Sequence, residues 1–402
     1  MKNKVKVAAV GVGGRGYSIL EGLLVHMDNV EVTAVCDLYE DRVNAAAASV
    51  VRVYGEEHRP FGTTDYREIM TRDDVEAVII MSAWESHIPI AIDAMEHGKA
   101  VGMEVGGAYS VDQCWELVHA WERTRVPFMF LENCCYGEAE MMVMNMVKLG
   151  LFGDVVHCEG GYRHDLRDEV IFGRENRHYR LRNYLSRNCE NYPTHELGPI
   201  AQILDINRGN RFLSLVSVAS KSAGLNAFAA AHPKADQSLA TADFAQGDVV
   251  TTIIKCARGE TITLTLDTTL PRAYSRGFTV QGTKGMYMED NRSVFLDSDH
   301  GGTDHWDWSP EWNNQVKYLE KYSHPTWVEY HKNGIRGGHG GMDGLVYDAF
   351  IECVRTGTPC PIDVYDAAAW MVVTPLSEQS IAMGGAPVAF PDFMGGMCTE
   401  RT

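Results

Sequence analysis

The stretch "KVKVAAVGVGGRGYSILEGLL", residues 4–24, decides the fold of the first part of the chain. It has the pattern of a strand, a glycine turn and a helix, and the turn places Gly11, Gly13 and Gly16 in GxGxxG spacing. The first glycine of such a turn permits a tight bend, the second lets a pyrophosphate approach the backbone, and the third allows close strand–helix packing. The helix N-terminus adds partial positive charge. The stretch therefore predicts a dinucleotide-binding site.

A carboxylate follows this turn at the distance along the chain that is expected for a dinucleotide-binding site. The apolar run "VEVTAVCD" ends at Asp37, 21 residues after Gly16. A carboxylate in this position accepts hydrogen bonds from ribose hydroxyls and repels a 2′-phosphate. The cofactor that we expect is therefore NAD rather than NADP.

Strand-like and helix-like segments alternate in the first part of the chain. Apolar runs at 75–81, 99–105 and 127–133 are separated by helical patterns at 86–98 and 111–124. Such alternation is typical of a doubly wound parallel sheet. We expect this sheet over about the first 125 residues.

The pattern changes in the second part. A helix over 138–150 is expected to lead into a strand that ends at Tyr162, and another helix is expected within 192–209. Runs rich in β-branched residues then predict a mainly antiparallel sheet. These runs are 212–220, 248–257, 260–270 and 277–289.

We therefore expect an α/β protein of two domains. Residues 1–125 would form an NAD-binding Rossmann domain, and 126–402 an α/β domain with an open, mainly antiparallel sheet. Residues 229–247 are expected to form a loose loop, and helices to return from about Met342.

The charge of the chain excludes several classes of partner. Asp and Glu number 54 against 36 Lys and Arg, a net charge of −18, which repels phosphate backbones and anionic lipid. No apolar run approaches the roughly 20 residues needed to span a bilayer. Ten cysteines without a CxxC pair favour reduced thiols. We expect a cytoplasmic protein that binds neither nucleic acid nor membranes.

Polar side chains gather in three segments of the second half, at 160–167, 178–184 and 191–199, which include His164 and His195. Pro193 prevents a helix from starting before it and fixes the turn, so Thr194 and His195 are expected at a helix entrance. A histidine there can carry protons near neutral pH, and a tyrosine beside a cation is expected to have a lowered pKa. An ordinary surface of packed tyrosines and paired arginines is the alternative.

Other chemistries have weaker support. His164 with Asp165, or His339 with Asp343, are conceivable metal ligands, but neither pair has a third ligand nearby, and we expect no metal. The sequence has no GxSxG elbow, and the carboxylate pair of an ordinary glycosidase is not identifiable.

Two tryptophans allow two interpretations. Trp306 and Trp308 could stack on the apolar faces of a sugar, or they could anchor a loop.

Several segments resemble the Gfo/Idh/MocA oxidoreductase family: "VGVGGRG", "AVCDLYEDR", "TTDYREIM", "SHIPIAIDAMEHGKAV" and "VQGTKG". The resemblance implies a Rossmann domain followed by an α/β domain with an open sheet, and an oligomer formed through that sheet. Dehydrogenases of this family usually carry Glu-Lys-Pro where this chain has Glu104, Val105 and Gly106. The lysine that assists proton transfer is absent here. Asn191 also replaces the family's aspartate, four residues before His195.

Within this group the chain most resembles glycoside hydrolase family 109, the NAD-dependent α-N-acetylgalactosaminidases. The similarity rests on "EVGGAYSVDQCWELV", "LENCCYGEAEMMVMNMV", "GGYRHDLR", "YPTHELGPIAQILDINRG", "PRAYSRGFTVQGTKG", "GHGGMD" and "DVYDAAAW". Beyond the glycines of the turn, it implies cofactor contacts at Gly14, Arg15, Asp37, Trp84 to His87, Glu104, Val105 and Asn133. It implies sugar contacts at Tyr162, Arg180, Tyr192, Pro193, Thr194, His195 and Tyr274. Two departures are Tyr179, where a tryptophan is expected, and Glu196, where a glycine is usual.

This resemblance implies a hydrolysis without net oxidation. Carbon 3 of the sugar is oxidised transiently, which acidifies the hydrogen on carbon 2, and loss of that hydrogen expels the glycosidic oxygen. Water then adds and carbon 3 is reduced again. Candidates for the proton transfers are Tyr162, His195, Tyr192 and Tyr136, with Arg180 orienting the substrate. An NAD-linked sugar dehydrogenase and a non-enzymatic sugar or dinucleotide sensor are the alternatives.

Overall fold

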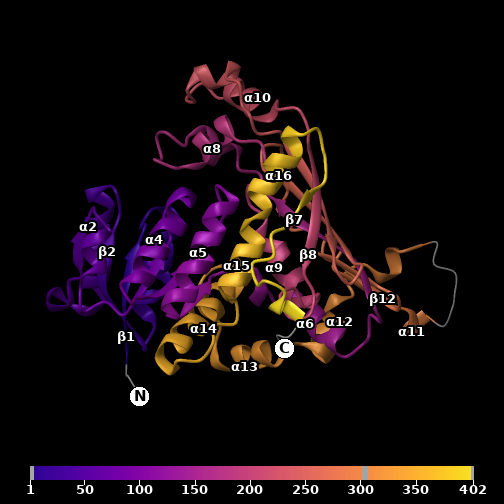
Figure 1. Cartoon of the computed structure of the whole chain (residues 1–402), viewed down its shortest axis with the longest axis horizontal. Coiled ribbons are helices and arrows are strands. Elements are labelled where there is room, and N and C mark those ends of the chain that lie inside the picture. Colours follow the sequence, from indigo (N-terminus) through magenta and orange to yellow (C-terminus); the bar gives the residue numbers. More distant parts are fainter. Residues whose placement is uncertain (1–3, 301–306, 400–402) are drawn as a thin grey trace. The chain divides into compact units, whose positions relative to one another are not determined.

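A six-stranded parallel sheet organises the first part of the chain in the computed structural model, which describes residues 4–300 and 307–399 (Figure 1). Its strand order is β3-β2-β1-β4-β5-β6. The strands are β1 (Val5–Val10), β2 (Val30–Cys36), β3 (Phe61–Thr63), β4 (Ala77–Ile80), β5 (Ala100–Met103) and β6 (Phe128–Phe130). The order reverses between β1 and β4, and ligands of such sheets bind outside the carboxyl ends of the strands at this point.

The connecting helices follow the sequence patterns closely. They are α1 (Gly14–Gly22), α2 (Glu40–Tyr54), α3 (Arg67–Met70), α4 (Trp84–Glu96) and α5 (Val111–Thr124), with 3-10 turns η1 (Leu24–His26), η2 (Glu56–His58) and η3 (Asn133–Tyr136). Local signals fix α5 at both ends. The Ser110 hydroxyl accepts the Gln113 amide at 3.1 Å, and Arg125 closes the helix in the left-handed conformation, φ 55°. The predicted doubly wound sheet is confirmed.

The chain forms two compact units, and each includes a segment distant in sequence. Unit 1 comprises 1–136 and 330–368, and unit 2 comprises 137–329 and 369–402. The later helices are α13 (Pro325–Asn333), η6 (His339–Gly341), α14 (Met342–Thr356), α15 (Val364–Met371) and α16 (Val373–Ala382). The division at 125/126 stays a prediction, because compact packing and domain boundaries are different quantities.

Unit 2 contains an eight-stranded sheet with the order β13-β12-β11-β7-β10-β9-β8-β14. The strands are β7 (Val155–Arg163), β8 (Phe212–Ala219), β9 (Val249–Cys256), β10 (Thr261–Asp267), β11 (Thr279–Gly282), β12 (Gly285–Met288), β13 (Ser293–Leu296) and β14 (Val388–Ala389). Only the β7–β10 pair is parallel, so the sheet is mainly antiparallel, as expected. Buried and half-exposed residues alternate along β10, which shows that one face covers a core.

The helices of residues 137–322 and the 3-10 turn before residue 400 belong to the same unit. They are α6 (Glu138–Lys148), α7 (Arg167–Ile171), α8 (Arg180–Ser186), α9 (Thr194–Ile203), α10 (Gly224–Ala231), α11 (Asp297–His300) and α12 (Gln315–Tyr322), with η4 (Gln237–Thr241), η5 (Ser309–Glu311) and η7 (Met397–Thr399). Helix α9 packs on β7, α6 packs on α9, and α16 lies along β8 (Figure 1). Among the helices of 4–300 and 307–399, not one combines the length and the apolar character that a bilayer crossing demands.

Two expectations about local structure were wrong. The supposed loop 229–247 contains the end of α10 and all of η4, because the alanine-rich segment has high helix propensity and buries Leu225 and Ala229. Helices return at α11, α12 and α13, before Met342. The run 277–289 contributes two antiparallel strands, β11 and β12, to the predicted sheet.

Candidate active site

The glycines of the turn between β1 and α1 differ in their surroundings: some are enclosed by backbone atoms, and others have room beside them. A Cβ on Gly11, whose φ is +86°, would lie 2.3 Å from a backbone nitrogen after β4, and one on Gly16 would lie 1.9 Å from the Gly11 carbonyl oxygen. A Cβ on Gly13 would meet only the tip of an arginine side chain, at 3.1 Å, and one on Gly14 would meet nothing within 4 Å. Protein packing therefore requires Gly11 and Gly16. The open space beside Gly13 and Gly14 fits a pyrophosphate.

Asp37 follows the last residue of β2 and is almost buried. Its carboxylate accepts the Tyr39 amide at 3.1 Å and lies 3.8 Å from the Arg42 guanidinium, which itself covers the Tyr39 ring. This arrangement fixes a carboxylate near the glycine turn, where it suits ribose hydroxyls. The residues present thus fit a dinucleotide.

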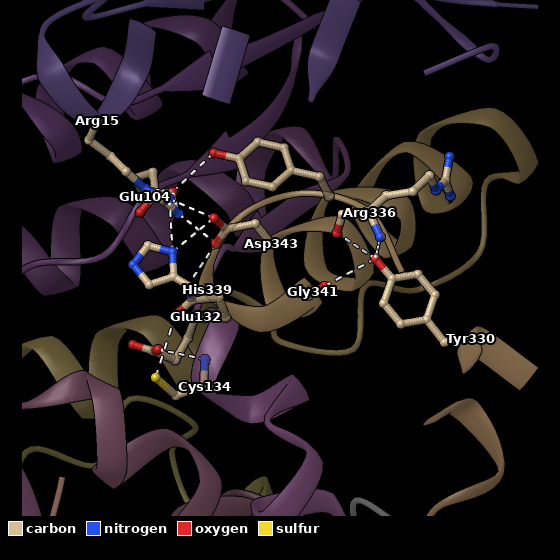
Figure 2. A network of polar contacts seen from close by, with 11 residues as sticks. Arg15, Glu104, Glu132, Cys134, Tyr330, Arg336, His339, Gly341 and Asp343 are labelled. Atoms are coloured by element: carbon tan, nitrogen blue, oxygen red, sulfur yellow. Dashed lines mark hydrogen bonds and ion pairs between the residues drawn. The ribbon is translucent and has the colours of Figure 1, made fainter. Parts of the chain in front are cut away.

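Arg15, on the first turn of α1, forms a bidentate ion pair with Asp343 on α14, 328 residues later in the chain (Figure 2). Its two terminal nitrogens donate to the Asp343 oxygens at 2.8 and 2.9 Å, and the same guanidinium donates to Glu104 Oε1 at 2.8 and 3.2 Å. His339 Nδ1 lies 2.9 Å from Asp343, and Asn133 donates to it at 2.8 Å. Arg15, Glu104 and Asn133, three predicted cofactor residues, therefore share one network within unit 1.

Sequence reasoning missed the role of Asp343 in this network. The pair with His339 was considered only as a possible metal site, but the guanidinium of Arg15 supplies the positive charge. Burial raises the pKa of Asp343, yet hydrogen bonds from Arg15 and His339 outweigh it and hold the pKa well below its usual range. Asp343 is therefore ionised at neutral pH. The "GHGGMD" segment was the signal, although its partner cannot be read from spacing.

A glycine-rich loop, 334–341, presents His339 to this network. Tyr330 holds the loop, because its hydroxyl donates to the Arg336 carbonyl oxygen at 2.6 Å and accepts the Arg336 amide at 2.9 Å (Figure 2). The Gly341 carbonyl oxygen lies 3.2 Å from the same hydroxyl. The loop is thus tied at both ends.

In the segment Glu104–Gly106, protein groups hold Glu104 and packing explains why position 106 carries no proline. Glu104 Oε1 also accepts the Tyr347 hydroxyl at 3.0 Å, and Glu104 Oε2 accepts the Val105 amide at 3.3 Å. A Cβ on Gly106 would lie 2.4 Å from the indole of Trp84. Glu104 is therefore held by protein groups, and its contact with a nicotinamide stays a prediction.

Trp84 and His87 lie on the first turns of α4 and are both buried. His87 Nε2 is 2.9 Å from the Ser82 carbonyl oxygen, and burial lowers the pKa of His87. His87 is consequently neutral and donates to that carbonyl. This hydrogen bond fixes the turn after β4, which lies beside Gly11.

Tyr136 ends η3 in unit 1, whereas the other three predicted proton-transfer residues belong to unit 2. Burial raises the pKa of Tyr136 well above its usual range. Such a tyrosine is a poor base at neutral pH.

In unit 2, aromatic rings surround Tyr162 near the end of β7. The ring centroid of Tyr162 lies 4.5 Å from that of Tyr192, 5.3 Å from that of His195 and 6.3 Å from that of Tyr274. Tyr274 is 50% exposed, while the other three are buried. The structure therefore brings together four predicted sugar-site residues, with one ring reaching solvent.

Tyr162 makes one hydrogen bond with a clear chemical meaning. Its hydroxyl lies 2.9 Å from Nδ1 of His164, two residues later on the chain. Burial lowers the pKa of His164, and the Arg180 guanidinium lowers it further, so the ring is neutral and can accept a proton. Burial raises the pKa of Tyr162, and Arg180 offsets only part of this rise. The expected lowering of a tyrosine pKa was wrong at this position because burial outweighs the cation.

Arg180 begins α8 and faces two of these rings. Its guanidinium carbon lies 5.3 Å from the Tyr192 centroid and 5.9 Å from that of Tyr162. Glu169 on α7, which sequence reasoning missed, holds Arg180 through an Nε–Oε1 contact of 2.9 Å. The cation is thus fixed beside the tyrosine pair, where it can stabilise developing negative charge.

The entrance of α9 is as predicted. Pro193 precedes the helix, and Thr194 and His195 begin it. Thr194 is fully buried, and its hydroxyl has no hydrogen-bond partner among the described residues. Asn191 donates to Gln246 at 3.2 Å, which anchors the segment before the turn. Of the two tryptophans, Trp306 lies outside the described residues, and Trp308 precedes η5.

Comparison with known families decides the relationship. Residues 5–131 match the oxidoreductase family with an NAD-binding Rossmann fold, and residues 136–400 match the C-terminal domain of glycosyl hydrolase 109. The chain belongs to glycoside hydrolase family 109. It is a glycosidase with an NAD-binding Rossmann domain, and the resemblance noted in the sequence is confirmed.

Full-length relatives agree with this assignment. The chain is 38% identical over 415 residues to an alpha-N-acetylgalactosaminidase of Tannerella forsythia, covering 98% of this chain and 86% of the relative. It is 39% identical over 396 residues to the alpha-N-acetylgalactosaminidase of Shewanella oneidensis, covering 98% and 85%. A family 109 protein of Stenotrophomonas maltophilia is 38% identical, covering 99% and 91%.

Solved structures share the fold at much lower identity. A levoglucosan dehydrogenase in complex with NADH and levoglucosan has a TM-score of 0.70 at 17% identity, covering 97% of this chain and all of that one. The scyllo-inositol dehydrogenase of Lactobacillus casei, with bound NAD(H) and scyllo-inositol, has a TM-score of 0.66 at 12% identity, covering 96% and 99%. These neighbours establish the fold of this family 109 chain.

Proposed function

We propose that this family 109 enzyme is an NAD-dependent, redox-neutral glycoside hydrolase acting on N-acetylgalactosaminides or related hexosides. The observation that carries the proposal is the Tyr162–His164 hydrogen bond beside the Arg180 cation. Tyr162 and His164 form a proton-transfer pair. The same chain has an intact glycine turn, and it carries Val105 where the dehydrogenases of the wider family carry a lysine. The names of the full-length relatives support the glycone.

Unit 1 would hold NAD. The open glycine turn, the N-terminus of α1 and the Asp37 carboxylate suit its pyrophosphate and ribose. NAD bound there supplies a hydride acceptor for carbon 3 of the sugar and later the same hydride for its return. The Arg15–Asp343 network fixes the residues around this turn.

Unit 2 would hold the sugar and move its protons. Once carbon 3 is a ketone, the hydrogen on carbon 2 becomes acidic, and a base can remove it as the bond from carbon 1 to the glycosidic oxygen breaks. The aglycone leaves as an alcohol, and water adds to carbon 1 while carbon 2 regains a proton. The Tyr162–His164 pair suits one of these transfers as a relay, because the Tyr162 hydroxyl can accept a substrate proton as it passes its own proton to neutral His164. His195 and Tyr192 are candidates for the others.

Arg180 would stabilise the negative charge that develops on the carbonyl oxygen as the carbon 2 hydrogen leaves. Its ion pair with Glu169 holds it against the Tyr162 and Tyr192 rings. Tyr274, half-exposed at the edge of the aromatic group, suits stacking on the apolar face of a sugar. Pro193 and Thr194 would shape the same turn.

An NAD-linked sugar dehydrogenase is the second candidate, favoured by the names of the structural neighbours. Purified protein, an aryl N-acetylgalactosaminide and no added electron acceptor separate the two functions. Release of aglycone over many turnovers with constant NADH absorbance supports the hydrolase. NADH that accumulates in proportion to product supports the dehydrogenase. Loss of cleavage after removal of the nucleotide, and recovery when NAD is added back, tests the cofactor itself.

We further propose a homo-oligomer and a cytoplasmic location. The open face of the eight-stranded sheet exposes Val218 and Ile253, which suit a contact between copies. Light scattering coupled to gel filtration measures the oligomeric state, and fractionation of cells measures the location. A monomer at micromolar concentration contradicts the first proposal.

A further inference from the structure

Three carboxylates surround the guanidinium of Arg276 in unit 2. Arg276 contacts Glu140 through Nη2, Glu196 through Nε at 3.2 Å, and Glu289 through Nε at 3.7 Å. Glu140 and Glu196 are almost completely buried. A single cation cannot balance two buried carboxylates and a third that is 23% exposed, so the group is stable only if it keeps a proton.

The carboxylates come from three different elements. Glu140 lies on α6, Glu196 on α9 and Glu289 just after β12. Strand β7 approaches α9 closely, since a Cβ on Gly160 would lie 2.5 Å from the Cβ of Glu196. Arg276 and its carboxylate partners therefore join α6, α9 and the sheet.

The surplus charge falls on Glu140 and Glu196, the two buried carboxylates that contact the same guanidinium. Two carboxyl groups that share one buried site cannot easily both be ionised, so one of them keeps a proton. Burial raises the pKa of Glu140, and Arg276 offsets part of this rise. The other charged or titratable group facing the pair is Glu289, with Tyr287 of β12 beside it, and burial raises the pKa of Tyr287 as well.

Each end of this group adjoins a residue of the sugar site. Glu196 directly follows His195 on α9, and Arg276 lies two residues after Tyr274. The Glu289 carboxylate also accepts the amides of Arg276 and Phe278, at 3.1 and 3.0 Å, which fixes the segment that carries Tyr274. His195 and Tyr274 both contact the Tyr162 ring.

We propose that Glu140 and Glu196 share one proton and, with Arg276, form a positioning group that holds His195 and Tyr274 around the bound sugar. The group does not touch the substrate, and the proposal rests on the proposed function of the aromatic site. When the shared proton is lost at alkaline pH, Glu140 and Glu196 repel each other. The entrance of α9 and the Tyr274 segment then lose their common anchor, and turnover falls.

Glu140→Gln is the direct test, since the amide keeps the shape of the side chain and removes its titration. We expect the alkaline limb of the kcat profile to move up by about one pH unit. Glu196→Ala, which removes the anchor, should lower kcat about tenfold through misplacement of the site. Glu159→Gln, an exposed carboxylate on β7, is the matched control and should change neither quantity.

A second measurement does not depend on activity. Relative to the wild-type protein at neutral pH, Glu140→Gln and Glu196→Gln should each lose the infrared carbonyl band of one protonated carboxyl group, while the band of Glu190, whose pKa burial raises to about 8, stays. A difference spectrum that shows no such loss in either variant, or an alkaline limb unchanged by Glu140→Gln, overturns the proposal. If the wild-type protein cleaves no glycoside, the proposed function fails, and the infrared band still decides whether the proton is shared.

Discussion

Asp343→Asn tests whether the network around Arg15 stabilises unit 1. The substitution keeps the shape of the side chain but removes the charge that Arg15 contacts at 2.8 and 2.9 Å. The amide oxygen still accepts hydrogen bonds on one side, while the amide nitrogen replaces the other oxygen and faces one Arg15 nitrogen together with either Asn133 or His339. The variant therefore loses a bidentate pair and gains two unfavourable contacts.

The expected loss follows from the geometry. Breaking a fully buried ion pair costs about 3–5 kcal/mol. Here the side chain of Arg15 is 32% exposed and keeps Glu104 as a partner, so the net cost is smaller. We expect the free energy of unfolding to fall by about 2 kcal/mol, which lowers the melting temperature by about 4–8 °C in a unit of this size.

The effect should depend on pH in one direction. The pKa of Asp343 is lowered in the folded protein, so the carboxylate contributes its full stability above its unfolded pKa of about 4 and loses it as the pH falls further. The difference between wild type and variant should therefore shrink below pH 4. Calorimetry at several pH values measures it.

Asp348→Asn, on the same helix, provides the control. Asp348 pairs with Arg336 at the surface, with an Nη2–Oδ2 distance of 2.5 Å, and such pairs contribute about 0–1 kcal/mol. Equal melting temperatures for both variants, or a larger loss for Asp348→Asn, would refute the reasoning about Arg15.

Four further substitutions test the two sites. Tyr162→Phe removes the hydroxyl whose hydrogen bond His164 accepts. We expect kcat to fall at least about 100-fold with little change in melting temperature. A kcat within threefold of the wild-type value would exclude the pair from proton transfer. Glu169→Gln removes the ion pair that holds Arg180. KM should rise by no more than about fivefold, because the carboxylate is more than a third exposed and such ion pairs are weak. An unchanged KM would show that this ion pair does not position Arg180. Gly13→Ala should weaken NAD binding at least about tenfold while the protein still folds, since the new Cβ would meet only the flexible tip of the Arg42 side chain, at 3.1 Å. A Cβ on Gly16 would lie 1.9 Å from a carbonyl oxygen, so Gly16→Ala should unfold unit 1. Titration of NAD by fluorescence, with thermal unfolding in parallel, distinguishes these two results from a common loss of structure.

Most of the fold could be predicted from local sequence patterns. The strand, glycine turn and helix at the N-terminus, and the acidic residue after β2, are short-range features that the sequence displays directly. The entrance of α9 is another, because proline restricts where a helix can begin. Predictions failed where tertiary contacts decided the outcome, as in α10, whose alanines become helical by burying one face.

The networks of the site could not be predicted for a related reason. Arg15 and Asp343 are 328 residues apart, and no periodicity links them. The same carboxylate beside His339 suggested a metal until the arginine was in place. A sequence shows which residues are charged, but not which of them meet.

Burial was the other quantity that the sequence did not provide. The gathering of tyrosines, histidines and Arg180 was foreseen, and an arginine beside a tyrosine suggested a lowered pKa. The pKa of Tyr162 is raised instead, because its ring is enclosed by Tyr192 and His195. The extent of desolvation depends on packing, and this decides the sign of the shift.

Hydrolysis in deuterated water tests the central claim most directly. An aryl N-acetylgalactosaminide is cleaved by the NAD-loaded enzyme, and the position of deuterium in the released sugar is determined by mass spectrometry and nuclear magnetic resonance. Elimination and readdition replace the carbon 2 hydrogen from solvent, so the account predicts one deuterium at carbon 2 of each product molecule. Product that retains its original hydrogen at carbon 2 after complete cleavage would contradict it.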